Sequence, residues 1–164
     1  MDRESCRSDR LIDESQISAI RLWEERQQLA FAVAAAAHAG QTDKAGHPYI
    51  EHPVAVASML ETPEQKIVAL LHDVLEDTDM TEEDLRDYGF PASVIEAVCL
   101  LTREPQQDYI AYIEKLRHNE LARAVKLADL THNMDLGRLP EITKKDRLRQ
   151  KKYERAKAIL LEGK

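Results

Sequence analysis

The stretch IVALLHDVLED, residues 67–77, joins five apolar residues directly to a histidine and three acidic side chains. Its pattern predicts one helix in which Glu76 follows His72 by four residues and Asp77 follows Asp73 by four, so that each pair stacks. Like charges would then crowd near the helix C-terminus, where the macrodipole disfavours anions. A divalent metal held by His72 and Asp73 would offset this repulsion, and the alternative is a solvated acidic helix end.

The length and composition indicate one soluble globular domain. A chain of 164 residues with 43% hydrophobic and 32% charged residues can bury a real core. The longest apolar run, residues 29–37, is far shorter than the roughly 20 residues that cross a bilayer. The first residues lack the apolar segment of a signal peptide, and Cys6 and Cys99 suggest no disulfide framework. We therefore expect a cytoplasmic protein without a membrane partner.

The charge is acidic overall but uneven along the chain. The formal net charge of −7 argues against nucleic acid as the main partner. Residues 138–157 nevertheless carry nine Lys or Arg side chains against three Asp or Glu. This basic segment is either a solvated helix face on an acidic body or a cationic wall for a phosphate-bearing ligand. The sequence predicts no particular oligomeric state.

The apolar spacing and the breakers predict an all-α fold, with residues 1–14 as a flexible tail and 15–164 as one domain. There is no strand alternation, internal repeat or domain linker. A loop is expected between residues 41 and 51, where glycine and proline interrupt the pattern. The predicted helices span residues 15–39, 53–60, 63–77, 81–88, 91–101, 107–117, 120–136 and 143–161.

Two further side chains can complete a metal site with His72 and Asp73. His52 precedes Pro53 at a loop-to-helix junction, a rigid point from which an imidazole can be aimed. Asp129 lies on a helix among apolar neighbours, where an unpaired carboxylate is costly to bury. Two imidazoles and two carboxylates form a mixed nitrogen and oxygen donor set, which suits manganese, iron or zinc better than calcium.

Four ordered blocks carry a resemblance to a known family: AHAGQ at residues 37–41, KAGHPYIEHP at 44–53, ALLHDVLEDT at 69–78 and VKLADLTHNM at 125–134. Together they resemble the HD superfamily of metal-dependent phosphohydrolases. More narrowly, they are similar to the hydrolase domain of the RelA/SpoT family and to stand-alone small alarmone hydrolases. The resemblance covers about residues 30–160 and implies a single helical HD domain.

The resemblance also implies a role for each matched side chain. It makes manganese the expected metal, with Glu76 and Asp77 as the pair that activates or positions the attacking water and handles protons. The implied metal ligands are His52, His72, Asp73 and Asp129. Among the other histidines, His38 and His132 are expected to support the ligands or the core, whereas His47 and His118 are expected in loops or on the surface.

The same resemblance implies a small-molecule nucleotide substrate. The expected contacts are Lys44 before the first ligand histidine, Asn133 four residues after the last ligand aspartate, and Arg149 with Tyr153 on the terminal helix. A cation and a ring four residues apart suit a phosphate and a base; the alternative is a surface arginine and a packed tyrosine. Lys126 either tunes the site or is a structural partner of Asp129.

Two positions depart from the guanine-alarmone pattern. Asp43 and Asp135 stand where these hydrolases commonly carry arginine, so each places an anion near the expected polyphosphate. The predicted activity is a (p)ppGpp-type 3′-pyrophosphohydrolase that releases pyrophosphate. Because of the departures, an adenine alarmone or the 2′-phosphate of NADPH stays open as substrate. The alternatives are a nucleotide phosphatase that releases orthophosphate from NADPH or a nucleoside monophosphate, and a non-catalytic nucleotide-binding regulatory module.

Overall fold

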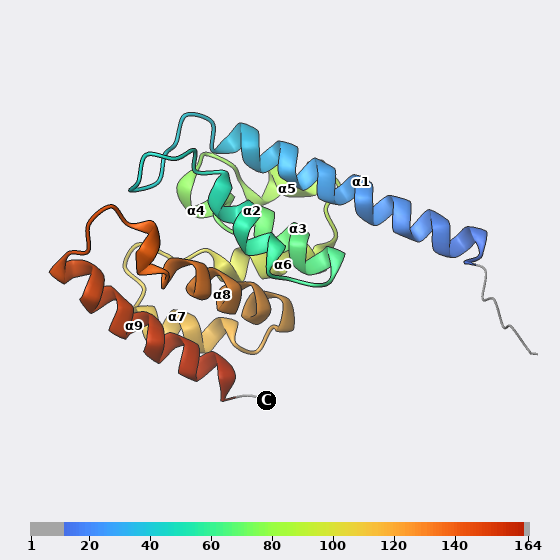
Figure 1. Cartoon of the computed structure of the whole chain (residues 1–164). Coiled ribbons are helices and arrows are strands. Elements are labelled where there is room, and N and C mark those ends of the chain that lie inside the picture. Colours follow the sequence, from blue (N-terminus) through green and yellow to red (C-terminus); the bar gives the residue numbers. More distant parts are fainter. Residues whose placement is uncertain (1–11, 163–164) are drawn as a thin grey trace, which may run out of the picture.

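Figure 1 shows the computed structural model, which describes residues 12–162 as a helical bundle with no strand in that range. This confirms the all-α prediction. The elements are α1 (Glu14–Ala37), α2 (Glu51–Ser58), α3 (Pro63–Leu71), α4 (Val74–Asp77), α5 (Glu82–Asp87), α6 (Ala92–Leu101), α7 (Tyr109–Leu116), α8 (Glu120–Asn133), the 3₁₀ turn η1 (Leu136–Arg138) and α9 (Lys144–Leu161).

Local capping explains why several helices begin close to their predicted positions. The hydroxyls of Thr62, Thr81 and Thr143 each accept a backbone N–H bond three residues further on, and a side chain returns to the threonine N–H. Pro63 occupies the first position of α3, where no intrahelical N–H bond is required. These interactions act within one helical turn, so the sequence alone predicts them.

The apolar run 67–71 forms the centre of the bundle. All five of its residues are at most 4% exposed, and α3 packs against α1, α2, α6 and α8. A helix surrounded on several sides needs no polar face, which explains why this run shows no polar interruption. The central helix therefore delivers its C-terminal end, and with it His72, into the interior.

The predicted continuous helix over residues 63–77 is wrong at its middle. Helix α3 ends at Leu71, His72 and Asp73 form a turn, and α4 begins at Val74. The ring of His72 bonds the carbonyl of Ala69, and Asp73 adopts φ −106° and ψ −3°. Glu76 and Asp77 consequently lie in the first turn of a new short helix, not at the end of a long one.

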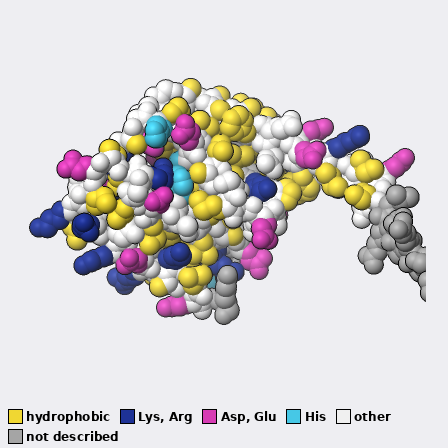
Figure 2. All heavy atoms as spheres, in the orientation of Figure 1, with side chains coloured by type: hydrophobic (Ala, Val, Ile, Leu, Met, Phe, Trp, Pro, Cys, Tyr) yellow, Lys and Arg dark blue, Asp and Glu magenta, His cyan; other side chains and the backbone are white. Residues whose placement is uncertain are grey.

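The fully buried residues of α1 all lie in its second half. Ala30, Val33 and Ala34 are buried, whereas Ile17 and Ile20 are 39% and 47% exposed despite their helical spacing. Figures 1 and 2 show the first part of α1 leaving the body as an arm that carries hydrophobic and acidic side chains. Of the predicted tail, residues 1–11 lie outside the described range, and Asp13 caps α1.

Smaller differences concern helix ends. Helix α2 begins at Glu51, α7 begins at Tyr109 after the cap Asp108, and α8 ends at Asn133 before η1.

Within residues 12–162, no helix has the length and apolarity needed to cross a membrane. The loop after α1 and the segment between α8 and α9 meet at one end of the bundle (Figure 1). The candidate site lies at this end.

Candidate metal centre and its pocket

Four predicted ligand side chains meet although 77 positions of sequence separate the first from the last. His52 comes from the first turn of α2, His72 and Asp73 from the turn after α3, and Asp129 from α8. The Nε2 atom of His52 is 3.1 Å from Asp129 Oδ1 and 3.7 Å from Asp73 Oδ2. The Nε2 atom of His72 is 3.0 Å from Asp73 Oδ2 and 3.7 Å from Asp129 Oδ1.

The surroundings of His72 favour a positive charge between the ligand atoms of these four side chains. Its Nδ1 lies 2.6 Å from the Ala69 carbonyl, which can only accept, so Nδ1 carries a proton and Nε2 faces the carboxylates. This Nε2 atom is buried without a hydrogen-bond partner. Burial alone would lower the pKa of His72, but Asp73 and Asp129 outweigh it and raise that pKa well above its ordinary value. Such a buried donor set fits a divalent cation.

Asp129 is held as a carboxylate by partners on its own helix. It is 4% exposed; Lys126 Nζ lies 2.8 Å from Oδ2, and Asn133 Nδ2 donates to Oδ1 at 2.7 Å. Burial would raise the pKa of Asp129, but Lys126 and the two histidines hold it well below its ordinary value. Lys126 is thus an ion-pair partner of the aspartate, and Asn133 is its hydrogen-bond partner.

A chain of three side chains fixes the ring of His52. Arg138 Nη1 donates to His132 Nδ1 at 3.0 Å, which makes that nitrogen an acceptor. His52 Nδ1, 2.8 Å from the same atom, must then be the donor, so the lone pair of His52 is on Nε2. Burial and the neighbouring His52 and Arg138 lower the pKa of His132 to about 4, so its ring is neutral at pH 7.

Tyr49, in the loop before α2, and His38, at the end of α1, also support the site. The hydroxyl of Tyr49 donates to Asp73 Oδ2 at 2.5 Å, and its ring packs 4.8 Å from the ring of His38. His38 is 2% exposed, and its Nδ1 lies 2.9 Å from Gln41 Oε1, while Gln41 Nε2 donates to the Asp77 carbonyl. The block AHAGQ at residues 37–41 therefore ties the end of α1 to α4.

Glu76 and Asp77 line the pocket beside Asp73, within reach of solvent. Partial burial, reinforced by repulsion from Asp73, raises the pKa of both side chains. The Arg103 backbone N–H donates to Glu76 Oε2 at 3.3 Å and partly offsets this effect. A carboxylate with a raised pKa next to a metal-type donor set is suited to accept a proton.

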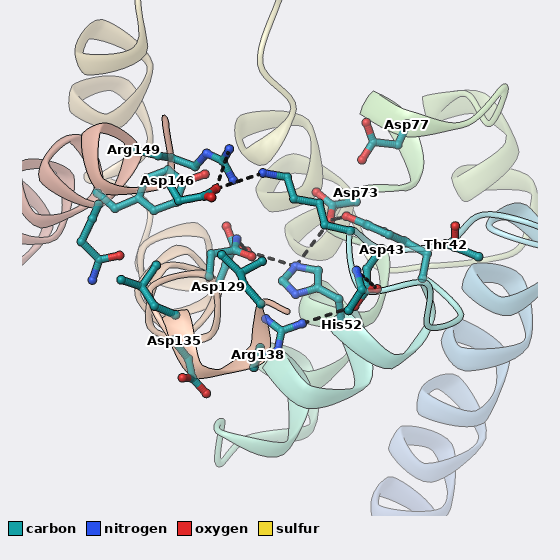
Figure 3. Close-up of a pocket in the computed structure, with 18 of the residues that line it drawn as sticks. Thr42, Asp43, His52, Asp73, Asp77, Asp129, Asp135, Arg138, Asp146 and Arg149 are labelled. Atoms are coloured by element: carbon teal, nitrogen blue, oxygen red, sulfur yellow. Dashed lines mark hydrogen bonds and ion pairs between the residues drawn. The ribbon is translucent and has the colours of Figure 1, made fainter. Parts of the chain in front are cut away.

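The pocket around the cluster has a volume of about 410 Å³ (Figure 3). All four predicted substrate contacts line it: Lys44, Asn133, Arg149 and Tyr153. The histidines outside the cluster follow their predictions, since His47 and His118 are exposed.

Asp146 is a pocket residue that sequence reasoning missed. Its Oδ1 lies 3.4 Å from Lys44 Nζ and 3.3 Å from Arg149 Nη2 (Figure 3). Asp146 therefore pairs with two of the basic side chains that are predicted to bind the substrate. Its Oδ2 accepts from the Thr143 hydroxyl and N–H, and these bonds lower the pKa of Asp146 to about 2. The capping-box spacing from Thr143 to Asp146 is the sequence feature that could have indicated an ordered aspartate at this position.

The two acidic departures have local partners. Asp43 Oδ1 accepts the N–H groups of Ala45 and His47 and so closes the loop, while Arg138 Nη2 lies 3.7 Å from its other oxygen. Asp135 Oδ1 accepts the Gly137 N–H at the start of η1. Arg138, which was not singled out from the sequence, thus brings a cation to the place where position 43 supplies an anion.

Comparison with known proteins agrees with this arrangement. The HD domain model matches residues 30–155.

The chain belongs to the HD domain family.

Its curated relatives include the guanosine-3′,5′-bis(diphosphate) 3′-pyrophosphohydrolase of Haemophilus influenzae, 42% identical over 117 residues that cover 62% of this chain and 17% of that protein. The bifunctional (p)ppGpp synthase/hydrolase SpoT of Escherichia coli K12 is 40% identical over 124 residues, covering 67% of this chain and 18% of the relative. The chain therefore spans less than a fifth of the length of these relatives.

A solved structure extends the similarity over nearly the whole chain. It is described as a metazoan ortholog of SpoT that hydrolyzes ppGpp, and it superimposes with a TM-score of 0.70 at 25% identity. The match covers 84% of this chain and 86% of that one. These findings confirm the HD-domain resemblance and the helical fold. Membership in the HD family and the His/Asp cluster together support a divalent metal at this site.

Proposed function

We propose that this HD domain is a metal-dependent 3′-pyrophosphohydrolase acting on nucleotide alarmones of the (p)ppGpp type. The observation that carries the proposal is the cluster of His52, His72, Asp73 and Asp129. All of these but His72 line a pocket that also has acidic and basic side chains. The named activities of the relative from Haemophilus influenzae and of the metazoan SpoT ortholog point in the same direction.

Manganese is the proposed metal, and His52, His72, Asp73 and Asp129 are its proposed ligands. The mixed nitrogen and oxygen donors and the unpartnered His72 Nε2 support this choice. When bound, the ion would lower the pKa of a water molecule and polarise a phosphoryl oxygen. The chain's own contribution is to fix the donor atoms, which the bond from His52 to His132 and that from His72 to Ala69 achieve.

Glu76 and Asp77 are the proposed pair for proton handling. The water oxygen forms a bond to the phosphorus attached to the ribose O3′, and the bond between that phosphorus and O3′ breaks. One carboxylate takes the proton of the water, and the protonated carboxyl supplies a proton to the leaving O3′. The raised pKa of both groups supports this exchange. The products are pyrophosphate and the nucleoside 5′-phosphate.

The remaining pocket residues are proposed to hold the nucleotide. Lys44 and Arg149 would leave Asp146 in part to contact phosphate oxygens, and the ring of Tyr153 would contact the base or sugar. A pocket of about 410 Å³ in a chain with a formal net charge of −7 suits a small nucleotide better than a nucleic acid or a membrane. A cytoplasmic location is part of the same proposal.

A substrate panel tests the proposed reaction. With manganese present, guanine and adenine alarmones should yield pyrophosphate, and NADPH and deoxynucleotides should react at least about tenfold more slowly by kcat/KM. Pyrophosphate and orthophosphate are measured separately. Orthophosphate from NADPH without pyrophosphate from any alarmone would instead establish the phosphatase. Nucleotide binding without turnover of any substrate would establish the non-catalytic module.

His132 is expected to matter through His52. The His132→Ala variant removes the acceptor that orients the His52 ring, so its affinity for manganese should fall by about 10- to 100-fold. Isothermal calorimetry with MnCl₂ measures this affinity. His118→Ala is the matched control, because His118 is exposed and lines no part of the pocket. Equal manganese affinities in both variants would show that His132 does not position the ligand.

A further inference from the structure

A smaller cavity of about 150 Å³ adjoins the metal pocket. It shares walls with that pocket at Glu76, Lys126, Asp129, Asn133 and Tyr153. The residues that line only the smaller cavity are Arg103, Tyr109, Tyr112, Leu130 and Lys152. We call it the Tyr109 cavity. Because Glu76 and Asp129 belong to both spaces, a ligand group bound at the metal cluster can continue directly into it.

Arg103 and Lys152 bring two positive charges to this cavity, beside the shared carboxylates of Glu76 and Asp129. Lys152 Nζ lies 4.4 Å and Arg103 Cζ 5.8 Å from the centre of the Tyr109 ring. Within residues 12–162, neither Arg103 nor Lys152 forms an ion pair. Partial burial, together with repulsion from Arg103, Arg149 and Lys126, lowers the pKa of Lys152. An anion in the cavity would relieve this repulsion.

The hydroxyl of Tyr109 is a second, independent sign of a ligand. It is a buried oxygen with no hydrogen-bond partner among the described residues, an arrangement that costs free energy unless something binds there. Burial raises the pKa of Tyr109 to about 12, so the hydroxyl keeps its proton at neutral pH and can donate. A hydroxyl donor on a ring that two cations without ion-pair partners approach is suited to phosphate oxygens.

We propose that the Tyr109 cavity receives the distal phosphate of a diphosphate group whose proximal phosphate lies at the metal cluster. Arg103, Tyr109 and Lys152 would then make the enzyme prefer a 3′-diphosphate ester to a 3′-monophosphate ester. This inference rests on the proposed function and deepens it, because it assigns residues to the choice between releasing pyrophosphate and releasing orthophosphate.

The test compares three guanosine substrates in the full chain with manganese: the 5′-diphosphate 3′-diphosphate, the 5′-monophosphate 3′-diphosphate and the 5′-diphosphate 3′-monophosphate. In the Arg103→Met and Lys152→Met variants, kcat/KM for both 3′-diphosphates should fall by about 10- to 100-fold. Turnover of the 3′-monophosphate should stay within about twofold of wild type. Lys152→Arg should restore the preference, and Tyr109→Phe should lower it.

Lys151→Met is the matched control, since Lys151 is exposed on the same helix and lines neither space. The inference would be overturned if the loss of kcat/KM depended on the number of 5′-phosphates or was equal for all three substrates. It would also be overturned if the variants kept the wild-type preference for 3′-diphosphates over the 3′-monophosphate.

A binding measurement separates this inference from the proposed function. Calorimetry with inorganic pyrophosphate and with orthophosphate, at matched MnCl₂ in cell and syringe, needs no turnover. The Arg103→Met/Lys152→Met variant should bind pyrophosphate about tenfold or more weakly, with orthophosphate binding unchanged. Equal pyrophosphate affinity in both proteins overturns the cavity assignment, whereas absence of alarmone turnover in wild type overturns the proposed function.

Discussion

The Asp73→Asn variant is expected to lose its bound metal and at least about 1,000-fold of its turnover. Asp73 Oδ2 lies 3.0 Å from His72 Nε2 and 3.7 Å from His52 Nε2, so it is central to the donor set. Asparagine keeps the size of the side chain and can still accept from Tyr49, but it removes the negative charge. Metal content by mass spectrometry and kcat with manganese measure the two losses.

Asp79→Asn provides the control for this experiment, because it makes the same change at an exposed position outside the pocket. Thermal melts of both variants verify that each is folded. Full metal content together with full turnover in Asp73→Asn would show that the metal assignment is wrong.

Combining Glu76→Gln with Asp77→Asn is expected to lower turnover by about 10²- to 10⁴-fold while manganese stays bound. The double variant keeps all four proposed ligands but lacks the two carboxylates that are proposed to accept the proton of water. Metal content by mass spectrometry and kcat measure the outcome, with Glu82→Gln/Glu83→Gln on α5 as the control outside the pocket. An unchanged rate with metal bound would contradict the proton-handling role.

The same variant should be more stable than wild type when metal is absent. The fold raises the pKa of Glu76 and of Asp77, so the charged forms at neutral pH cost stability. The gain in melting temperature should be present above the raised pKa values and vanish below the ordinary values of 4.5 and 3.8. Melting curves of the metal-free proteins between pH 4 and pH 8 measure this trend.

The helices and many of their first residues could be predicted from the sequence because the interactions that form them are local. The bonds from Thr81 to Asp84 and from Thr143 to Asp146 span three residues, and the burial of residues 67–71 follows from their unbroken apolarity. The turn at His72 and Asp73 was missed because neither glycine nor proline marks it. The side chain of Asp73 is instead held by Tyr49, from a loop 24 positions away.

The exposed first half of α1 illustrates another limit of pattern reading. Ile17 and Ile20 have helical apolar spacing, yet they are exposed within the described part of the chain. Spacing reveals which residues share a helix face, but only the arrangement of the other helices decides whether that face is covered.

The sequence by itself determined the all-α fold and proposed a four-residue donor set, because capping, periodicity and the donor chemistry of His and Asp are properties of short segments. Only the tertiary structure decided where the charges are balanced. It placed Arg138 beside Asp43, joined Lys44 to Asp146 across 102 positions, and left Arg103 and Lys152 around Tyr109. Electrostatic interaction depends on distance through space, and no sequence spacing fixes that distance between separate helices.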